Sequence, residues 1–216
     1  MMSPQHARLL ELITASLPLG ELAHDREHVL RVHTWAMRLA PEARADAELA
    51  GATALVHDLV FVPKDSPDRA QGGERSAAAA PAVLTAAGYA AGDIAQIAEA
   101  VRTSSWSRGL NPTNALGVVL QDADRLDALG AIGVLRTAAC GQFMSTAACP
   151  GRFYDPHDPL ATSGRPLDDR RQVIDHVHAK LLKLLPGMHL PSARAEAERR
   201  HVFLLQFVSE LAAELR

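Results

Sequence analysis

Aromatic residues and cysteines are scarce in this chain of 216 residues. Aromatic side chains make up 4% of the sequence, and Cys140 and Cys149 are its only cysteines. The two cysteines form no CxxC pair and no signal peptide precedes them, which argues against a secreted disulfide framework. We therefore expect free, mostly buried thiols and a cytoplasmic protein.

Long hydrophobic runs and a large excess of one charge are also absent. The longest stretch without a charge, residues 76–92, contains Pro81 and Gly88 and is shorter than the roughly 20 apolar residues of a membrane-spanning helix. The 22 Lys and Arg residues nearly balance the 25 Asp and Glu residues, which gives a net charge of -3. This balance provides no bulk attraction for polymeric nucleic acid or an anionic membrane, so we expect neither as a partner.

The sequence has instead the composition of a helical domain with a sizeable core. Apolar residues make up 48% of the chain and charged residues 22%. Ala, Leu, Arg and Glu dominate, and long alternating runs of Val, Ile and Thr are missing. We predict a single all-α domain over residues 1–216, a helical bundle with its core at about residues 22–186 and a C-terminal helix packing on it at about residues 192–215.

Apolar periodicity and residues that end helices place the elements of this bundle. The predicted helices cover residues 25–39, 46–60, 74–87, 93–103, 113–144, 168–185 and 192–215. Asp93, with Gln96 one turn later, resembles a capping box at the start of one helix. Proline and glycine mark irregular segments at residues 63–73 and 150–166. The first of these loops follows directly after His57 and Asp58, so we expect it to be functional.

The ten histidines are the unusual feature of the composition, because imidazole transfers protons at neutral pH and binds transition metals. His57 and Asp58 lie in an apolar predicted helix, where each costs free energy unless it is paired or bound to an ion. Taken alone, such a dipeptide is more often a core histidine with a local ion pair. His28 and Asp124, in two further predicted helices, extend the pattern to His, His-Asp, Asp.

Two imidazoles and two carboxylates form a donor set for a divalent metal ion. A helical bundle can point such residues inward from three helices and leave positions open for water and substrate, which is more typical of a catalytic than of a structural metal site. The mixed nitrogen and oxygen donors suit Mn²⁺, Fe²⁺, Co²⁺, Ni²⁺ or Zn²⁺.

Four segments of the sequence resemble the HD-domain metal-dependent phosphohydrolases, and among them the YedJ/YpgQ-like bacterial branch. These segments are residues 24–32, 56–69, 121–133 and 174–184, and the similarity extends over about residues 24–210. The resemblance implies an HD-type bundle in which His28, His57, Asp58 and Asp124 bind the metal, with His57 and Asp58 as the catalytic pair. The expected cofactor is Mn²⁺, with the other ions named above and Mg²⁺ as alternatives.

The same resemblance implies hydrolysis of a phosphate ester or anhydride of a nucleotide, with a (deoxy)nucleoside triphosphate as the expected substrate. Two other classes stay open. One is a guanosine tetraphosphate hydrolase or a cyclic-nucleotide phosphodiesterase, and the other is a nucleotide-binding module without catalytic activity. The small phosphorylated substrate is the only partner that the sequence indicates, and it leaves the oligomeric state open.

The sequence departs from the family pattern at two positions. Ser104 precedes Ser105 where family members have a His-Ser pair, so we expect one metal ion per chain rather than two. Phe61 stands where some HD hydrolases carry a glutamate that acts on water. Water activation is therefore expected to depend mainly on the metal.

Several neighbouring residues are candidates for supporting roles. Lys64 and Arg69 in the loop after Asp58 are expected to bind substrate phosphate, unless the loop is simply solvated. Arg125 is a phosphate ligand or a partner of Asp122. His24 and Asp127 lie one turn from His28 and Asp124 and are expected to orient these ligands, although His24 is also a candidate ligand, phosphate donor or helix-end group. The late helix adds three residues that could reach the pocket mouth but more commonly pack or face solvent: Asp175, His176 and His178.

Overall fold

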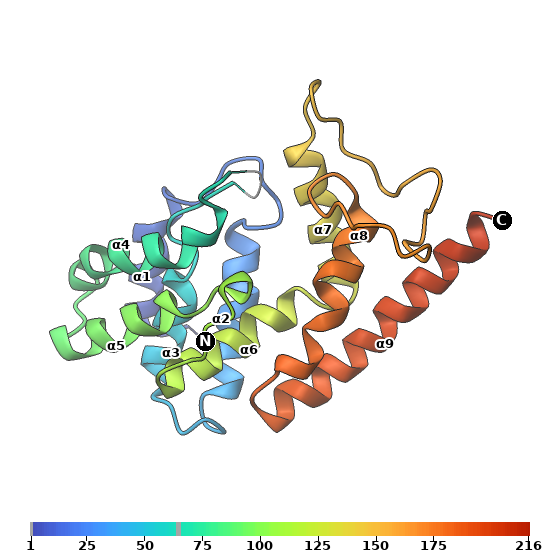
Figure 1. Cartoon of the computed structure of the whole chain (residues 1–216). Helices are drawn as coiled ribbons and strands as arrows, with labels where there is room; N and C mark the ends of the chain where they lie inside the picture. Colours follow the sequence, from blue (N-terminus) through green and yellow to red (C-terminus); the bar gives the residue numbers. More distant parts are fainter. Residues whose placement is uncertain (1, 64–65) are drawn as a thin grey trace. The chain divides into compact units, whose positions relative to one another are not determined.

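The computed structural model describes residues 2–63 and 66–216 and is built from helices (Figure 1). In these ranges the only β pairing consists of two isolated bridges, Arg152 with Gln172 and Asp155 with Asp158. The all-α prediction is confirmed. None of the helices described here has the length and apolar content needed to cross a membrane.

The chain divides into two compact units. Unit 1 comprises Met1–Gly20 and His24–Asp124, and unit 2 comprises Glu21–Ala23 and Arg125–Arg216. Unit 1 contains α1 (Pro4–Thr14), α2 (Arg26–Leu39), α3 (Ala47–Val56), α4 (Gly72–Ala86), α5 (Ala91–Arg102) and α6 (Ala115–Asp127) through Asp124. Unit 2 contains α7 (Gly130–Met144), α8 (Val173–Ala179) and α9 (Pro191–Glu214). Short 3₁₀ turns lie at Arg69–Gln71 (η1), Trp106–Arg108 (η2), Leu181–Lys183 (η3) and Leu185–Gly187 (η4).

The helix α3 lies at the centre of unit 1. It packs against α1, α2, α4 and α5, and every residue from Ala50 to Val56 is buried. A helix that is apolar on all sides belongs in a core, and its small residues allow close approach. At Gly51, for example, an added Cβ would lie 2.2 Å from Cε1 of His6. The central helix thereby fixes the position of the residues that follow it, His57 and Asp58.

A buried histidine pair joins α1 to α2 in the same unit. Nε2 of His6 donates to the carbonyl of Glu48 at 2.7 Å, which leaves Nδ1 of a neutral His6 to accept from Nε2 of His33 at 3.1 Å. The carboxylate of Glu48 accepts from the hydroxyls of Ser3 and Tyr89, each at 3.0 Å. Burial and the neighbouring His6 lower the pKa of His33 to about 4, although Glu48 opposes the shift.

This depressed pKa predicts a loss of stability in acid. The ordinary pKa of His33 is 6.5. As the pH falls from 6.5 to about 4, His33 is protonated in the unfolded chain but stays neutral in the folded chain. The free energy of unfolding therefore falls over this pH range. We expect this loss to be on the order of 2–3 kcal/mol and to be smaller in His33→Gln, which keeps a donor but does not titrate. Urea unfolding of both proteins at pH 7.5, 6, 5 and 4.5 measures it, and equal slopes would contradict the prediction.

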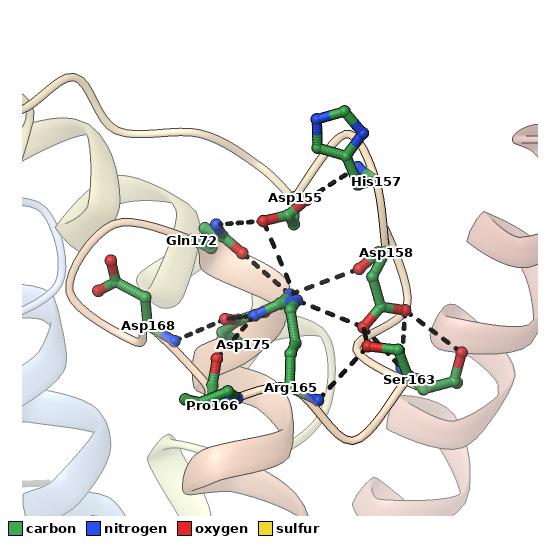
Figure 2. A network of polar contacts seen from close by, with 10 residues as sticks. Asp155, His157, Asp158, Ser163, Arg165, Pro166, Asp168, Gln172 and Asp175 are labelled. Atoms are coloured by element: carbon green, nitrogen blue, oxygen red, sulfur yellow. Dashed lines mark hydrogen bonds and ion pairs between the residues drawn. The ribbon is translucent and has the colours of Figure 1, made fainter.

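In unit 2, one arginine ties an irregular segment to α8 (Figure 2). Nη1 and Nη2 of Arg165 donate to the two carboxylate oxygens of Asp175 at 2.6 and 2.7 Å, and Nη2 also donates to Gln172 at 3.0 Å. Asp158 lies 3.3 Å from Nε of Arg165 and accepts from the Ser163 hydroxyl at 2.7 Å. The predicted irregular stretch at residues 150–166 is confirmed, and its order depends on these polar contacts.

Some predicted boundaries are wrong. The helix predicted at residues 113–144 is two helices, because Leu129 is extended and Gly130 has a φ of +73°, which ends α6 before α7 begins. The helix predicted at residues 168–185 is the short α8 followed by two 3₁₀ turns, and the one predicted at 46–60 ends at Val56. Asp93 caps no helix, since α5 begins at Ala91 after an uncapped Ala90.

Two further observations differ from or add to the sequence predictions. The first helix, α1, is missing from the predicted set, although Ser3 caps it by accepting from the His6 amide at 3.1 Å. Cys140 is half-buried and Cys149 is exposed, so the expected burial of the thiols is wrong for Cys149.

Candidate metal centre

The predicted ligands lie at the ends of helices in unit 1. His28 is in the first turn of α2, His57 and Asp58 follow the last residue of α3, and Asp124 is in the last turn of α6. The expectation that the His57-Asp58 pair lies inside a helix is therefore wrong. The apolar run of α3 ends one residue earlier, and this end brings both side chains to the edge of the core.

The donor atoms of these residues converge. Nε2 of His28 lies 3.2 Å from Nε2 of His57, and Oδ2 of Asp58 lies 3.6 Å from each of these nitrogens. Oδ1 of Asp124 is 3.7 Å from Nε2 of His28 and 3.9 Å from Nε2 of His57. Donors bound to one ion at about 2.1 Å are separated by roughly 3.0–3.4 Å for right-angled to tetrahedral arrangements. A small contraction would therefore let one divalent ion contact Nε2 of both histidines and Oδ2 of Asp58, with Asp124 close to both imidazoles.

The hydrogen bond of His57 selects a tautomer that suits metal binding. Nδ1 of His57 lies 2.7 Å from the carbonyl of Ala54, which can only accept, so Nδ1 carries the hydrogen. In the neutral ring the lone pair is then on Nε2, the atom that faces the other donors. A backbone carbonyl thus sets both the tautomer and the orientation of this imidazole, as groups behind a metal ligand commonly do.

The carboxylate of Asp58 is ionised at neutral pH. Its burial raises the pKa, but His57, the hydrogen bond from His28 and the nearby His24 together lower the pKa well below its usual value. The side chain of Asp58 is 35% exposed, so its carboxylate lies between the buried imidazoles and the surface of unit 1. His28, His57 and Asp58 together form a group with metal-binding geometry.

The surroundings of the cluster include two residues singled out from the sequence. The ring of His24 is buried and lies 5.8 Å from the ring of His28 and 5.8 Å from that of Phe61. Ser104 is buried as well, and its hydroxyl donates to the Val101 carbonyl at 2.8 Å. The structure therefore places His24 beside a predicted ligand and directs the Ser104 hydroxyl to the backbone of its own segment.

Two of the three predicted phosphate-binding residues lie among the described residues, one in each unit. Lys64 lies outside the described residues, and Arg69 is exposed at the start of η1. The loop is tied to α4 by Asp68, which accepts from Arg75 at 2.6 Å. In unit 2, Nη1 of Arg125 donates to the Gly187 carbonyl.

Three further candidates, Asp127, Asp175 and His176, have partners within unit 2. Asp127 is buried and pairs with Arg136 at 3.1 Å, and Arg136 in turn donates to the Ala23 carbonyl at 2.7 Å. On α8, Asp175 binds Arg165, and Nδ1 of His176 lies 3.5 Å from Asp169. These contacts organise unit 2.

Sequence reasoning missed one residue that contacts a predicted ligand. The side chain of Asp25 caps α2 and accepts from the backbone amide of His28 at 2.9 Å. The sequence does contain a signal for this contact, because an aspartate directly before the first residue of a helix is a common N-cap.

Comparison with known proteins gives consistent results. The model of the HD domain family matches residues 26–129. YpgQ of Bacillus subtilis (strain 168) is 32% identical over 196 residues, which cover 89% of this chain and 84% of YpgQ. A crystal structure of YpgQ in complex with ADP has a TM-score of 0.69 at 26% identity and covers 97% of both chains.

Two other solved structures extend this similarity. A Lactobacillus plantarum protein has a TM-score of 0.75 at 28% identity, covering 100% of this chain and 99% of its own. An HD-superfamily hydrolase of Bacillus thuringiensis has a TM-score of 0.68 at 26% identity, covering 98% of this chain and 96% of its own. Together with the converging histidines and aspartates, these similarities show that the chain belongs to the HD-domain metal-dependent phosphohydrolases, in the branch that includes YpgQ.

Proposed function

We propose that this enzyme hydrolyses a phosphate anhydride or ester of a nucleotide, with a (deoxy)nucleoside triphosphate as substrate and one Mn²⁺ ion held by His28, His57, Asp58 and Asp124. The observation that carries the proposal is the convergence of two imidazole nitrogens and two carboxylate oxygens, with mutual distances of 3.2–3.9 Å for the pairs that include a histidine. Mixed donors of this kind suit Mn²⁺ and its first-row neighbours.

A bound divalent ion would lower the pKa of a water ligand toward neutrality and offset charge on a phosphoryl oxygen. The residues of the chain supply the rest. His57 keeps its lone pair on Nε2 because Ala54 accepts the hydrogen of Nδ1, and the low pKa of Asp58 keeps its carboxylate available without acid competition. Phe61 provides no carboxylate that could take a proton from water.

The choice of a nucleotide is supported by the ADP complex of YpgQ, a relative that matches nearly the whole chain. We propose further that residues 1–216 act as one HD domain, with the core at about residues 22–186 and α9 packed on it. The low cysteine content supports a cytoplasmic location.

A product assay tests the proposed reaction. Metal-free protein is incubated with Mn²⁺, Mg²⁺, Co²⁺ or Ni²⁺ and a panel of nucleoside triphosphates, guanosine tetraphosphate and cyclic nucleotides, and the products are separated. Metal-dependent release of pyrophosphate or orthophosphate from triphosphates is the expected result. Linear monophosphates from cyclic nucleotides, or pyrophosphate from guanosine tetraphosphate alone, would identify one of the alternative hydrolases. Nucleotide binding without any product would indicate a binding module instead.

The loop after Asp58 makes a separate prediction. If Lys64 and Arg69 contact substrate phosphate, Lys64→Ala and Arg69→Ala should each lower kcat/KM by an amount equivalent to roughly 1.5–3 kcal/mol, the scale of a hydrogen bond to a charged group. The metal content should stay at the wild-type level. Steady-state kinetics and elemental analysis check both statements, with Arg8→Ala as a control that removes an exposed cation of α1 paired with Glu11. Unchanged kinetics in both variants would show that the loop is only solvated.

A further inference from the structure

We infer that Asp25 is a positioning residue of the metal centre, because its side chain fixes the helical turn that carries His28. This inference rests on the proposed function, since it takes His28 as a metal ligand. Asp25 has the extended backbone of an N-cap residue, with φ -78° and ψ -178°. Its Oδ1 accepts from the amide of His28 at 2.9 Å. His28 thus donates its backbone amide to the cap and places its imidazole in the group of donor atoms.

The position of His28 makes this contact important. The first amides of a helix have no partner inside the helix, and the first turn is the part that frays. His28 is in that turn, and its ring is fully buried against His57, with the two Nε2 atoms 3.2 Å apart. A small tilt of the turn would therefore change the separation of these two donor atoms. Loss of the cap should therefore lower the metal affinity as well as the stability of the helix.

The neighbouring helix α3 offers a matched comparison. Asp46 caps α3 in the same way and accepts from the amide of Leu49 at 3.0 Å. However, the ligand associated with α3 is His57, at the opposite end of the helix, and its ring is held locally by the Ala54 carbonyl. Removing the Asp46 side chain should cost helix stability of the same kind without moving a donor atom.

The expected effects separate positioning from stability. Replacing an N-cap aspartate by alanine destabilises its helix, whereas asparagine and serine cap about as well as aspartate. Groups that orient metal ligands typically change metal affinity by ten- to a hundredfold when they are removed. We expect Asp25→Ala to weaken the binding of Mn²⁺ and Co²⁺ by about tenfold. Asp46→Ala should change the affinity for these ions by less than about twofold. Asp25→Asn and Asp25→Ser should bind them about as tightly as the wild type.

The experiment is calorimetric titration of the metal-free full-length protein with Mn²⁺ and with Co²⁺ alone, for the wild type and these four variants. Thermal unfolding of the metal-free forms checks that Asp25→Ala and Asp46→Ala are destabilised to a similar extent. If Asp25→Ala does not fold, Asp25→Gly removes the same hydrogen bond at a smaller cost to the helix and should show the same loss of affinity.

Two results would overturn the inference. Equal loss of affinity in Asp25→Ala and Asp46→Ala would mean that only general stability matters, and failure of Asp25→Asn to restore binding would mean that the charge of Asp25, and not its cap hydrogen bond, is responsible. A wild-type protein that binds neither ion would instead contradict the proposed function itself, so the two failures can be told apart.

Discussion

Asp58→Ala is expected to abolish hydrolysis and to lose the bound metal. Both carboxylates lie within 3.9 Å of Nε2 of both histidines, so removing any of the four proposed ligands should leave an incomplete site with an altered charge. The same result is expected for His28→Ala, His57→Ala and Asp124→Ala. Removing a group that only orients a metal ligand already lowers metal affinity or activity by ten- to a hundredfold. Loss of a ligand itself should therefore reduce kcat by at least about a hundredfold. Metal analysis of the purified variants and a phosphate-release assay measure both effects.

A carboxylate elsewhere in unit 1 provides the control for these variants. Asp93 lies in the first turn of α5, outside the donor cluster, so Asp93→Ala should retain both metal and turnover. A variant of any of the four residues that keeps near-normal metal content and turnover would show that this residue is not a ligand. Variants that lose activity but keep the metal would assign the residue to another step.

Arg165→Ala should produce the largest loss of stability in unit 2. Asp175 is completely buried and its two oxygens accept from Arg165 at 2.6 and 2.7 Å, so the substitution leaves a buried carboxylate without its countercharge (Figure 2). Asp168 would keep its amide hydrogen bond to Asp175 at 2.7 Å, but one amide does not balance a full charge. We expect the unfolding temperature of the protein to fall by roughly 10 °C.

An exposed bidentate pair tests whether burial is the cause. Nε and Nη2 of Arg102 donate to the two carboxylate oxygens of Glu99 at 2.8 and 2.7 Å, with side chains 37% and 36% exposed, and Arg102→Ala should lower the unfolding temperature by no more than about 3 °C. Adding Asp175→Asn to Arg165→Ala should recover part of the loss, because a neutral amide is cheaper to bury than an unpaired carboxylate. Scanning calorimetry distinguishes these cases. Equal shifts for the two arginine variants would contradict the role given to burial.

The extent of the sequence prediction differs between elements for physical reasons. The helices α2 and α9 are close to their predicted ranges because apolar periodicity and a proline mark their ends. The break between α6 and α7 was not predicted, since the apolar pattern continues through it and only the backbone of Leu129 and Gly130 changes direction. Periodicity records which side of a helix is buried, but it does not record where the chain leaves one helix axis for another.

A similar limit applies to the candidate site. The order His, His-Asp, Asp was enough to name four residues whose side chains lie close together. Imidazoles and carboxylates cost free energy in a core unless they pair with one another or bind an ion. The partners of Arg125 and Asp127 could not be predicted. Gly187 and Arg136 are distant from them in the sequence, and only the folding of unit 2 brings them into contact.

The most direct test of the proposed metal centre is a crystal structure of the full chain grown with Mn²⁺, with anomalous scattering measured to locate the ion. We predict one anomalous peak per chain, within bonding distance of Nε2 of His28, Nε2 of His57, Oδ2 of Asp58 and Oδ1 of Asp124. With Ser104 in place of the family histidine, no second peak is expected beside it. A peak bound by other residues would contradict the four-ligand assignment, and a second ion beside His24 would contradict the single-metal site.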